Sequence, residues 1–161
     1  MAANQAVKEN SPAVQAHLSI LQSVIQRMAS NSASCKSWCI TIVSAVLVIV
    51  ADKGKYQFAA IALIPLFLFL GLDTYYLALE IMFRDSYNTF IEKLHRKTLT
   101  VSDLYAVSPQ GKFRYVLPKS FKSFSVWPFY LVLLVMICIA AFYVIRSGAP
   151  ETMGRDCRPY H

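Results

Sequence analysis

Two acidic residues interrupt a long apolar stretch of this sequence, and their spacing places them on one face of a helix. Asp73 and Glu80 are seven residues apart, about two turns, with Tyr76 and Arg84 on the same side. Glu80 and Arg84 have the i,i+4 spacing of a helical ion pair. Because ionisable groups at membrane depth need water or a partner, this stripe predicts a cation pathway, with Asp73 repeated around an oligomer. The alternative is that the bilayer ends near Leu72 and both acids lie on a cytoplasmic extension.

Basic side chains alternate with aromatic ones in the segment that follows. This combination suits phosphates and stacked bases, which predicts a nucleotide or oligonucleotide ligand. Two alternatives stay open: anionic lipid headgroups, or no ligand at all, since cytoplasmic loops beside spans are rich in Lys and Arg in any case. The residues concerned are Lys93, Arg96, Lys97, Lys112, Arg114, Lys119 and Lys122.

Catalytic and metal-binding patterns were not found. The histidines are scattered, and the sequence contains no HExxH, P-loop, GxGxxG or GxSxG pattern. The four cysteines form no CxxC pair and no zinc spacing, so we expect small apolar residues rather than a disulfide framework. We expect no enzyme activity, no cofactor and no metal.

Three segments have almost no charge, and they predict an all-α integral membrane protein. The chain is 56% hydrophobic with a mean hydropathy of +0.43, and the segments lie at residues 38–51, 56–72 and 126–145. A span needs roughly 20 residues, so the first segment must rely on Lys36 and Lys53 reaching the two interfaces. We expect three spans, the first an uncleaved signal anchor. Two spans plus an interfacial helix is the alternative.

The elements around these spans divide the chain into five parts. Residues 1–35 are expected to form a tail and an N-terminal amphipathic helix that begins at Ser11-Pro12 and ends in a bend at residues 30–34. Residues 36–96 form a transmembrane hairpin whose second helix continues to His95, with Pro65 loosening its middle. Residues 97–125 form a basic cytoplasmic segment with a small β-hairpin, which Pro118 ends. Residues 126–146 are the third span, and residues 147–161 a flexible outer tail.

The distribution of Lys and Arg near the spans predicts the orientation. One side carries eleven such residues, eight in residues 84–122 together with Lys8, Arg27 and Lys36. The other side carries five, which are Lys53, Lys55, Arg146, Arg155 and Arg158. We therefore expect a multi-pass protein of the cell (inner) membrane, with its N-terminus in the cytoplasm and its C-terminus outside.

Several short runs resemble a family of small bacterial membrane proteins. They are HLSILQSVIQRMA at residues 17–29, then Asn31-Ser32, Lys36-Ser37-Trp38, Ile64-Pro65, LDTYYL at residues 72–77, and Phe83-Arg84. The resemblance covers about residues 17–87 and includes no catalytic motif. It implies a membrane effector of an antiphage defence operon, similar to the channel-forming effector of the Hailong type. In such systems a nucleotidyltransferase partner makes a nucleic-acid signal that controls the channel.

Together these patterns predict a homo-oligomer, for instance a tetramer, that forms a gated ion-conducting pore in abortive antiphage defence. Under the resemblance, the seven basic residues are the expected signal contacts. Asp73, Tyr76 and Glu80 are the expected pore or gate residues, with Arg84 and Pro65 beside them. The alternative is a non-conducting membrane anchor or adaptor that recruits a cytoplasmic partner or anionic lipid.

Overall fold

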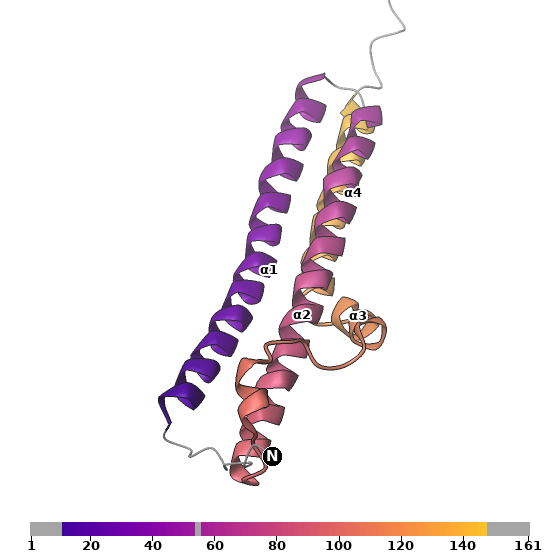
Figure 1. The fold of residues 1–161 in the computed structure, drawn as a ribbon. Coiled ribbons are helices and arrows are strands. Elements are labelled where there is room, and N and C mark those ends of the chain that lie inside the picture. Colours follow the sequence, from indigo (N-terminus) through magenta and orange to yellow (C-terminus); the bar gives the residue numbers. More distant parts are fainter. Residues whose placement is uncertain (1–10, 54–55, 148–161) are drawn as a thin grey trace, which may run out of the picture.

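Helices make up every regular element of the described residues, 11–53 and 56–147, in a computed structural model of the chain. Three of these helical segments are long and apolar enough to cross a membrane, as the hydropathy pattern predicted. Two long antiparallel helices lie side by side, and the last helix packs against their upper half (Figure 1). In chain order the elements are α1 (Pro12–Lys53), the 3-10 helix η1 (Tyr56–Ala62), α2 (Leu63–His95), the 3-10 helix η2 (Val101–Tyr105), α3 (Phe113–Phe121) and α4 (Trp127–Ser147).

Helix α1 begins where the sequence predicted but does not bend. Pro12 is its first residue, and the Ser11 side chain accepts a hydrogen bond from the Val14 amide at 3.3 Å. The predicted bend at residues 30–34 is wrong, because the helix continues through them to Lys53. Ser32 is buried against α2, so tertiary contact outweighs the weak helix propensity of the serines.

Helix α2 ends at His95 as predicted, but Pro65 does not lie in its middle. Residues 56–62 form η1, which makes Pro65 the third residue of α2. The helical path runs on from η1 into α2, so Pro65 lies near its beginning and not in its middle, and the predicted loosening stays a prediction. The helix closes with Lys97 at φ 56°, and the Thr98 amide donates to the Lys93 carbonyl at 3.0 Å.

The predicted β-hairpin is wrong, because residues 97–125 form η2 and α3. The Thr100 amide donates to Asp103 Oδ2 at 2.9 Å, which closes a capping box and starts a helical turn instead of a strand. Phe113 packs on Tyr75 of α2 with ring centroids 5.5 Å apart. Pro118 lies inside α3 rather than ending a strand.

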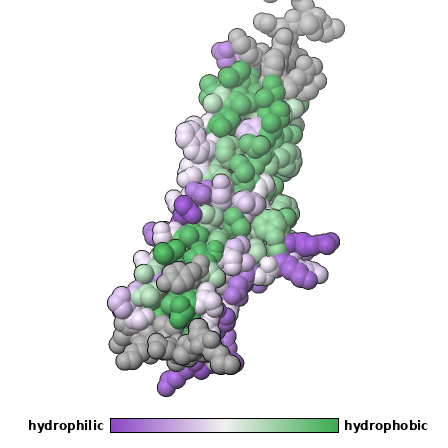
Figure 2. Space-filling view, viewed as in Figure 1, coloured by the Kyte–Doolittle hydropathy of each residue, from purple (hydrophilic) through white to green (hydrophobic). Residues whose placement is uncertain are grey.

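The apolar core has an upper part shared by three helices and a lower part beside α1 and α2. The upper cluster contains Cys39, Val43, Leu66, Tyr130, Leu133 and Ile137, and the lower one contains Val14, Phe90, Leu94 and Leu99. Cys35 and Cys39 are buried free thiols, as predicted for small apolar residues, whereas Cys138 is exposed. Apolar side chains cover the upper surface, and polar ones gather below it (Figure 2). Helix α4, the last of the three long helices, lies only along this apolar part (Figure 1).

The expected tails at residues 1–10 and 148–161 and the turn at residues 54–55 lie outside the described residues.

Candidate functional site

A buried ion pair joins α1 to α2. The Asp73 side chain is 0% exposed, and Lys36 Nζ lies 2.7 Å from its Oδ2 and 2.8 Å from its Oδ1. The Ser32 hydroxyl also donates to Asp73 Oδ1, and Lys36 Nζ lies 3.3 Å from the Ser32 Oγ. We call these three residues the α1–α2 latch. A charge buried among apolar helices is tolerated when it is paired and hydrogen-bonded, which the latch achieves within one chain.

The latch lies at the border of the apolar three-helix section. The Tyr130 hydroxyl, one turn into α4, donates to the Phe69 carbonyl at 3.0 Å, and Phe69 is one turn before Asp73. Asp73 is therefore nearly level with the start of α4. The distance from Tyr56 through η1 and α2 to Asp73 is about 30 Å, the thickness of the hydrocarbon core. The structure places Asp73 inside the protomer, facing α1, rather than on an outer face.

The other predicted pore or gate residues are distributed along α2. Glu80 and Arg84 form the expected i,i+4 ion pair at 2.6 Å, with side chains 11% and 62% exposed. Tyr76 is half-buried, and its ring packs edge-on against Tyr75 with centroids 5.6 Å apart. Pro65 lies two turns before Asp73, in the first turn of α2 and away from the remaining predicted residues. The structure thus brings together Glu80 with Arg84 and adds Lys36 and Ser32 to Asp73.

A line of hydroxyl side chains, not predicted from the sequence, runs along the face of α1 opposite the latch. Its members recur every three or four residues, and all are exposed: Ser30, Ser34, Ser37, Thr41 and Ser44. We call them the hydroxyl stripe. Ser37 Oγ and Thr41 Oγ1 donate to carbonyls one turn earlier, at 3.3 and 3.0 Å. Their protons are thus satisfied within the helix, and their oxygen lone pairs can accept further contacts.

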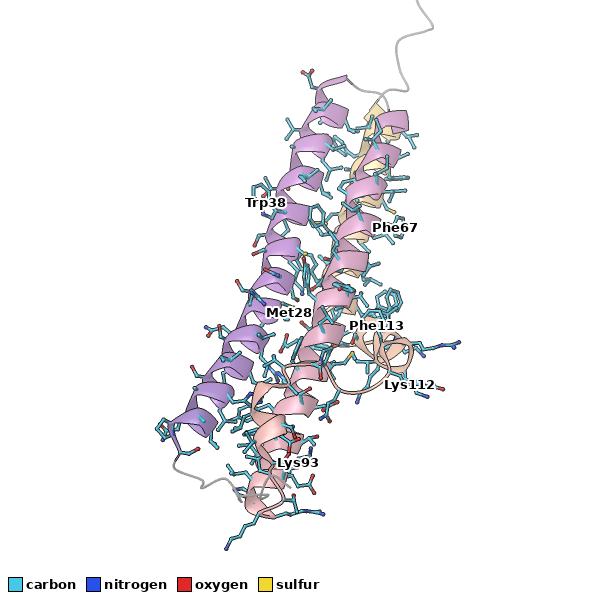
Figure 3. The ribbon with its side chains drawn as sticks, in the orientation of Figure 1. Met28, Trp38, Phe67, Lys93, Lys112 and Phe113 are labelled. Carbon is cyan, nitrogen blue, oxygen red and sulfur yellow. The ribbon has the colours of Figure 1, made fainter. Side chains whose placement is uncertain are left out.

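The seven predicted basic residues fall into two groups. Lys93, Arg96 and Lys97 lie at the end of α2, where Lys93 pairs with Asp103 at 2.8 Å and Arg96 with Glu92 at 2.6 Å. Lys112, Arg114, Lys119 and Lys122 lie on or beside α3, and all four are exposed. Lys93 and Lys112 lie at different levels of the molecule (Figure 3). The structure therefore does not gather the basic residues into one patch.

A small cavity of about 80 Å³ lies beside the lower part of α1 and α2. His17, Thr89, Lys93 and Asp103 are among its lining residues. His17 is buried against the ring of Phe90 with centroids 4.5 Å apart, and its Nδ1 has no hydrogen-bond partner among the described residues. The cavity is much smaller than the roughly 300–1,000 Å³ of ordinary ligand pockets, so it does not fit a nucleotide.

No protein family, curated protein or solved structure matches this chain. The function has to be argued from the latch, the hydroxyl stripe, the basic residues and the sequence resemblance. Within the described residues, no group of His, Cys, Asp and Glu is placed to hold a metal ion.

Proposed function

We propose that several copies of this protein surround an ion-conducting pore whose wall is the hydroxyl stripe of α1. The observation that carries this proposal is the exposure of Ser34, Ser37, Thr41 and Ser44 in a helix long and apolar enough to span a membrane. In a monomer Thr41 and Ser44, which lie further into the apolar section than the latch, would face lipid tails. Polar side chains within a membrane normally face water or a neighbouring helix.

One protomer is too small to enclose the pore. The interior of its three long helices is filled by apolar side chains such as Val43, Leu66 and Ile137. A water-filled path therefore requires symmetry-related copies, with the same helix repeated around an axis. Small residues spaced along one face also let helix backbones approach closely. The oxygen lone pairs of the stripe favour cations over anions in such a path.

The latch serves as the gate in this proposal. Asp73 does not form the pore wall, since it is buried against Lys36 on the inner face of α1. Because latch and stripe lie on opposite faces of the same helix, a rotation of α1 that moves the stripe also strains the ion pair. Glu80 and Arg84 lie further along α2, beyond the border of the apolar section, where their ion pair supports the same helix.

The biological role is carried by the sequence resemblance over residues 17–87. We propose a defence effector whose pore is controlled by a nucleotide or oligonucleotide from a partner enzyme. The favoured contacts are four basic residues with no ion pair within the described part of the chain: Lys97, Lys112, Arg114 and Lys119. Lys93 and Arg96 are already paired, so they are less available for a phosphate.

Cysteine accessibility tests the pore wall directly. Thr41→Cys and Ser44→Cys are made in a chain in which the exposed Cys138 and the tail Cys157 are replaced by Ser. The protein is reconstituted in liposomes, and cation flux is followed before and after a charged, water-soluble thiol reagent is added. We expect both cysteines to react and flux to fall. Val132→Cys on α4 is the matched control, since Val132 is 55% exposed and lies five residues past the start of α4, as Thr41 lies five residues past Lys36.

The proposal is overturned if Thr41→Cys and Ser44→Cys react no faster than Val132→Cys while the protein is monomeric and gives no flux. The anchor or adaptor function would then stand. If the stripe cysteines react but no nucleotide condition gives flux, the oligomer part of the proposal stands and the ion-conduction part is wrong.

A further inference from the structure

An apolar groove opens between α2 and α4 in the membrane-spanning part of the molecule. It has a volume of about 210 Å³ and is lined by Leu66 and Leu70 of α2, Leu131 and Leu134 of α4, and Phe121 at the end of α3. The volume is below that of a drug-sized ligand site, but an acyl chain is narrow and can lie along it. We call this the α2–α4 groove.

A second hollow continues the groove toward the basic segment. Its volume is about 350 Å³, and it shares Trp127 and Leu131 with the α2–α4 groove. Its other lining residues include Lys122 and Phe124. Phe124 is 91% exposed, which is unfavourable in water but suits a ring placed among lipid headgroups. The two hollows therefore lead from an apolar channel to a lysine.

We propose that this groove binds one anionic phospholipid of the bilayer. Its acyl chain lies between α2 and α4, and its phosphate lies against the Lys122 ammonium, with Trp127 at the boundary between the two. The match is one of charge and depth. Lys122 directly follows α3 and lies five residues before Trp127, the first residue of α4. A headgroup near the start of the apolar section therefore meets a cation, and the tail meets apolar side chains.

The groove lies on a different side of the molecule from the hydroxyl stripe. Phe67, which lines the groove, projects away from α1, and Trp38 of α1 projects to the other side (Figure 3). Copies that associate through α1 leave the groove open to the bilayer. The lipid site therefore does not depend on the pore, and one can fail without the other.

The sequence provides a reporter, because the chain has only two tryptophans and Trp127 lines both hollows. The full-length Trp38→Phe variant is reconstituted with brominated phosphatidylglycerol or brominated phosphatidylcholine. The quenching of Trp127 fluorescence by each lipid is then measured. We expect the anionic lipid to be preferred about fivefold, the factor that corresponds to one lysine near a membrane surface. The preference should fall as salt is raised.

Two variants complete the test. Lys122→Gln should abolish the preference, whereas Lys112→Gln, the same charge change at the other end of α3, should leave it. Trp127→Phe leaves Trp38 as the reporter of ordinary annular lipid, which should show no preference. Equal quenching of Trp127 by both lipids, or a preference that Lys122→Gln leaves intact, overturns the proposal. The proposal is also overturned if neither lipid quenches Trp127 and Leu131→Cys cross-links to a second copy. The groove would then be an interface between protomers.

Discussion

Breaking the α1–α2 latch should destabilise the protein far more than breaking any other ion pair of the described residues. Asp73→Asn leaves the Lys36 ammonium without its carboxylate, and Lys36→Met leaves a carboxylate that is 0% exposed. Removal of one partner from a buried pair typically costs about 3–5 kcal/mol. Lys36 is 20% exposed and can extend toward water, so we expect about 3 kcal/mol for Asp73→Asn and a larger loss for Lys36→Met.

The assay is reversible unfolding in mixed micelles with increasing SDS, followed by circular dichroism. The two single variants and the double variant form a cycle, and the double should cost at least about 2 kcal/mol less than the sum of the singles. Glu80→Gln is the matched control, because Glu80 pairs with an Arg84 side chain that is 62% exposed. Its loss should be about 0.3–0.5 kcal/mol.

Additive single effects, or losses below about 1 kcal/mol for both variants, would refute the reasoning. The apolar contacts around Cys39 and Leu66 would then hold α1 to α2 unaided, and the latch could not serve as a gate.

Three further predictions concern single contacts. Lys97→Gly should raise the unfolding free energy by about 0.5–1 kcal/mol, because Lys97 has φ 56°; Lys97→Ala, which keeps the backbone penalty, should give no such gain. Hydrogen bonds from Lys93 lower the pKa of Asp103 to about 2, so this carboxylate stabilises the fold above pH 4 and the contribution is lost as pH falls toward 2. With solvent screening, Asp103→Asn should cost about 1 kcal/mol at pH 7 and only a small part of that at pH 2, where about half of the folded molecules have lost the Asp103 charge. A pH-independent difference in Tm would contradict this. Tyr130→Phe should cost about 1 kcal/mol through loss of its hydrogen bond to an α2 carbonyl, whereas the 71% exposed Tyr143→Phe should be neutral in the same assay.

Local sequence patterns predicted the features of this fold that depend on local chemistry. Long apolar runs gave the three helices able to span a membrane, the i,i+4 spacing gave the Glu80–Arg84 pair, and Ser11-Pro12 gave the start of α1. The wrong predictions concern segments whose structure depends on contacts with residues far away in the sequence. Residues 30–34 have weak helix propensity, yet the bend is absent because Ser32 reaches Asp73, 41 residues away.

Residues 113–117 contain aromatic and β-branched side chains, which favour a strand. They form α3 because Phe113, Val116, Leu117 and Ser120 share one helix face that packs toward α2. Asp73 was predicted as a site residue from the sequence. Its ion-pair partner Lys36 could not be predicted, because the pairing depends on the register between α1 and α2. The three- and four-residue spacing of the hydroxyl stripe is present in the sequence. It was not recognised because serine carries no charge and does not interrupt an apolar run.

In the proposed function, helix α1 links a signal outside the bilayer to the pore. One unbroken helix carries Lys36 and Ser32 on its inner face and Ser37 and Thr41 on its outer face. A rigid helix cannot turn its outer face without moving its inner one, so the position of the hydroxyl stripe is coupled to the latch. The coupling is at most the cost of breaking a buried pair, about 3–5 kcal/mol. A shift of a two-state population from 1:99 to 99:1 needs about 5.5 kcal/mol, so breaking the pair approaches a full switch only at the upper end of this range. The lower end of α1 reaches Pro12 and packs beside Phe90 near the Lys93–Asp103 pair. A polyanion that draws the basic end of α2 away from α1 would therefore act on the same helix that carries the stripe.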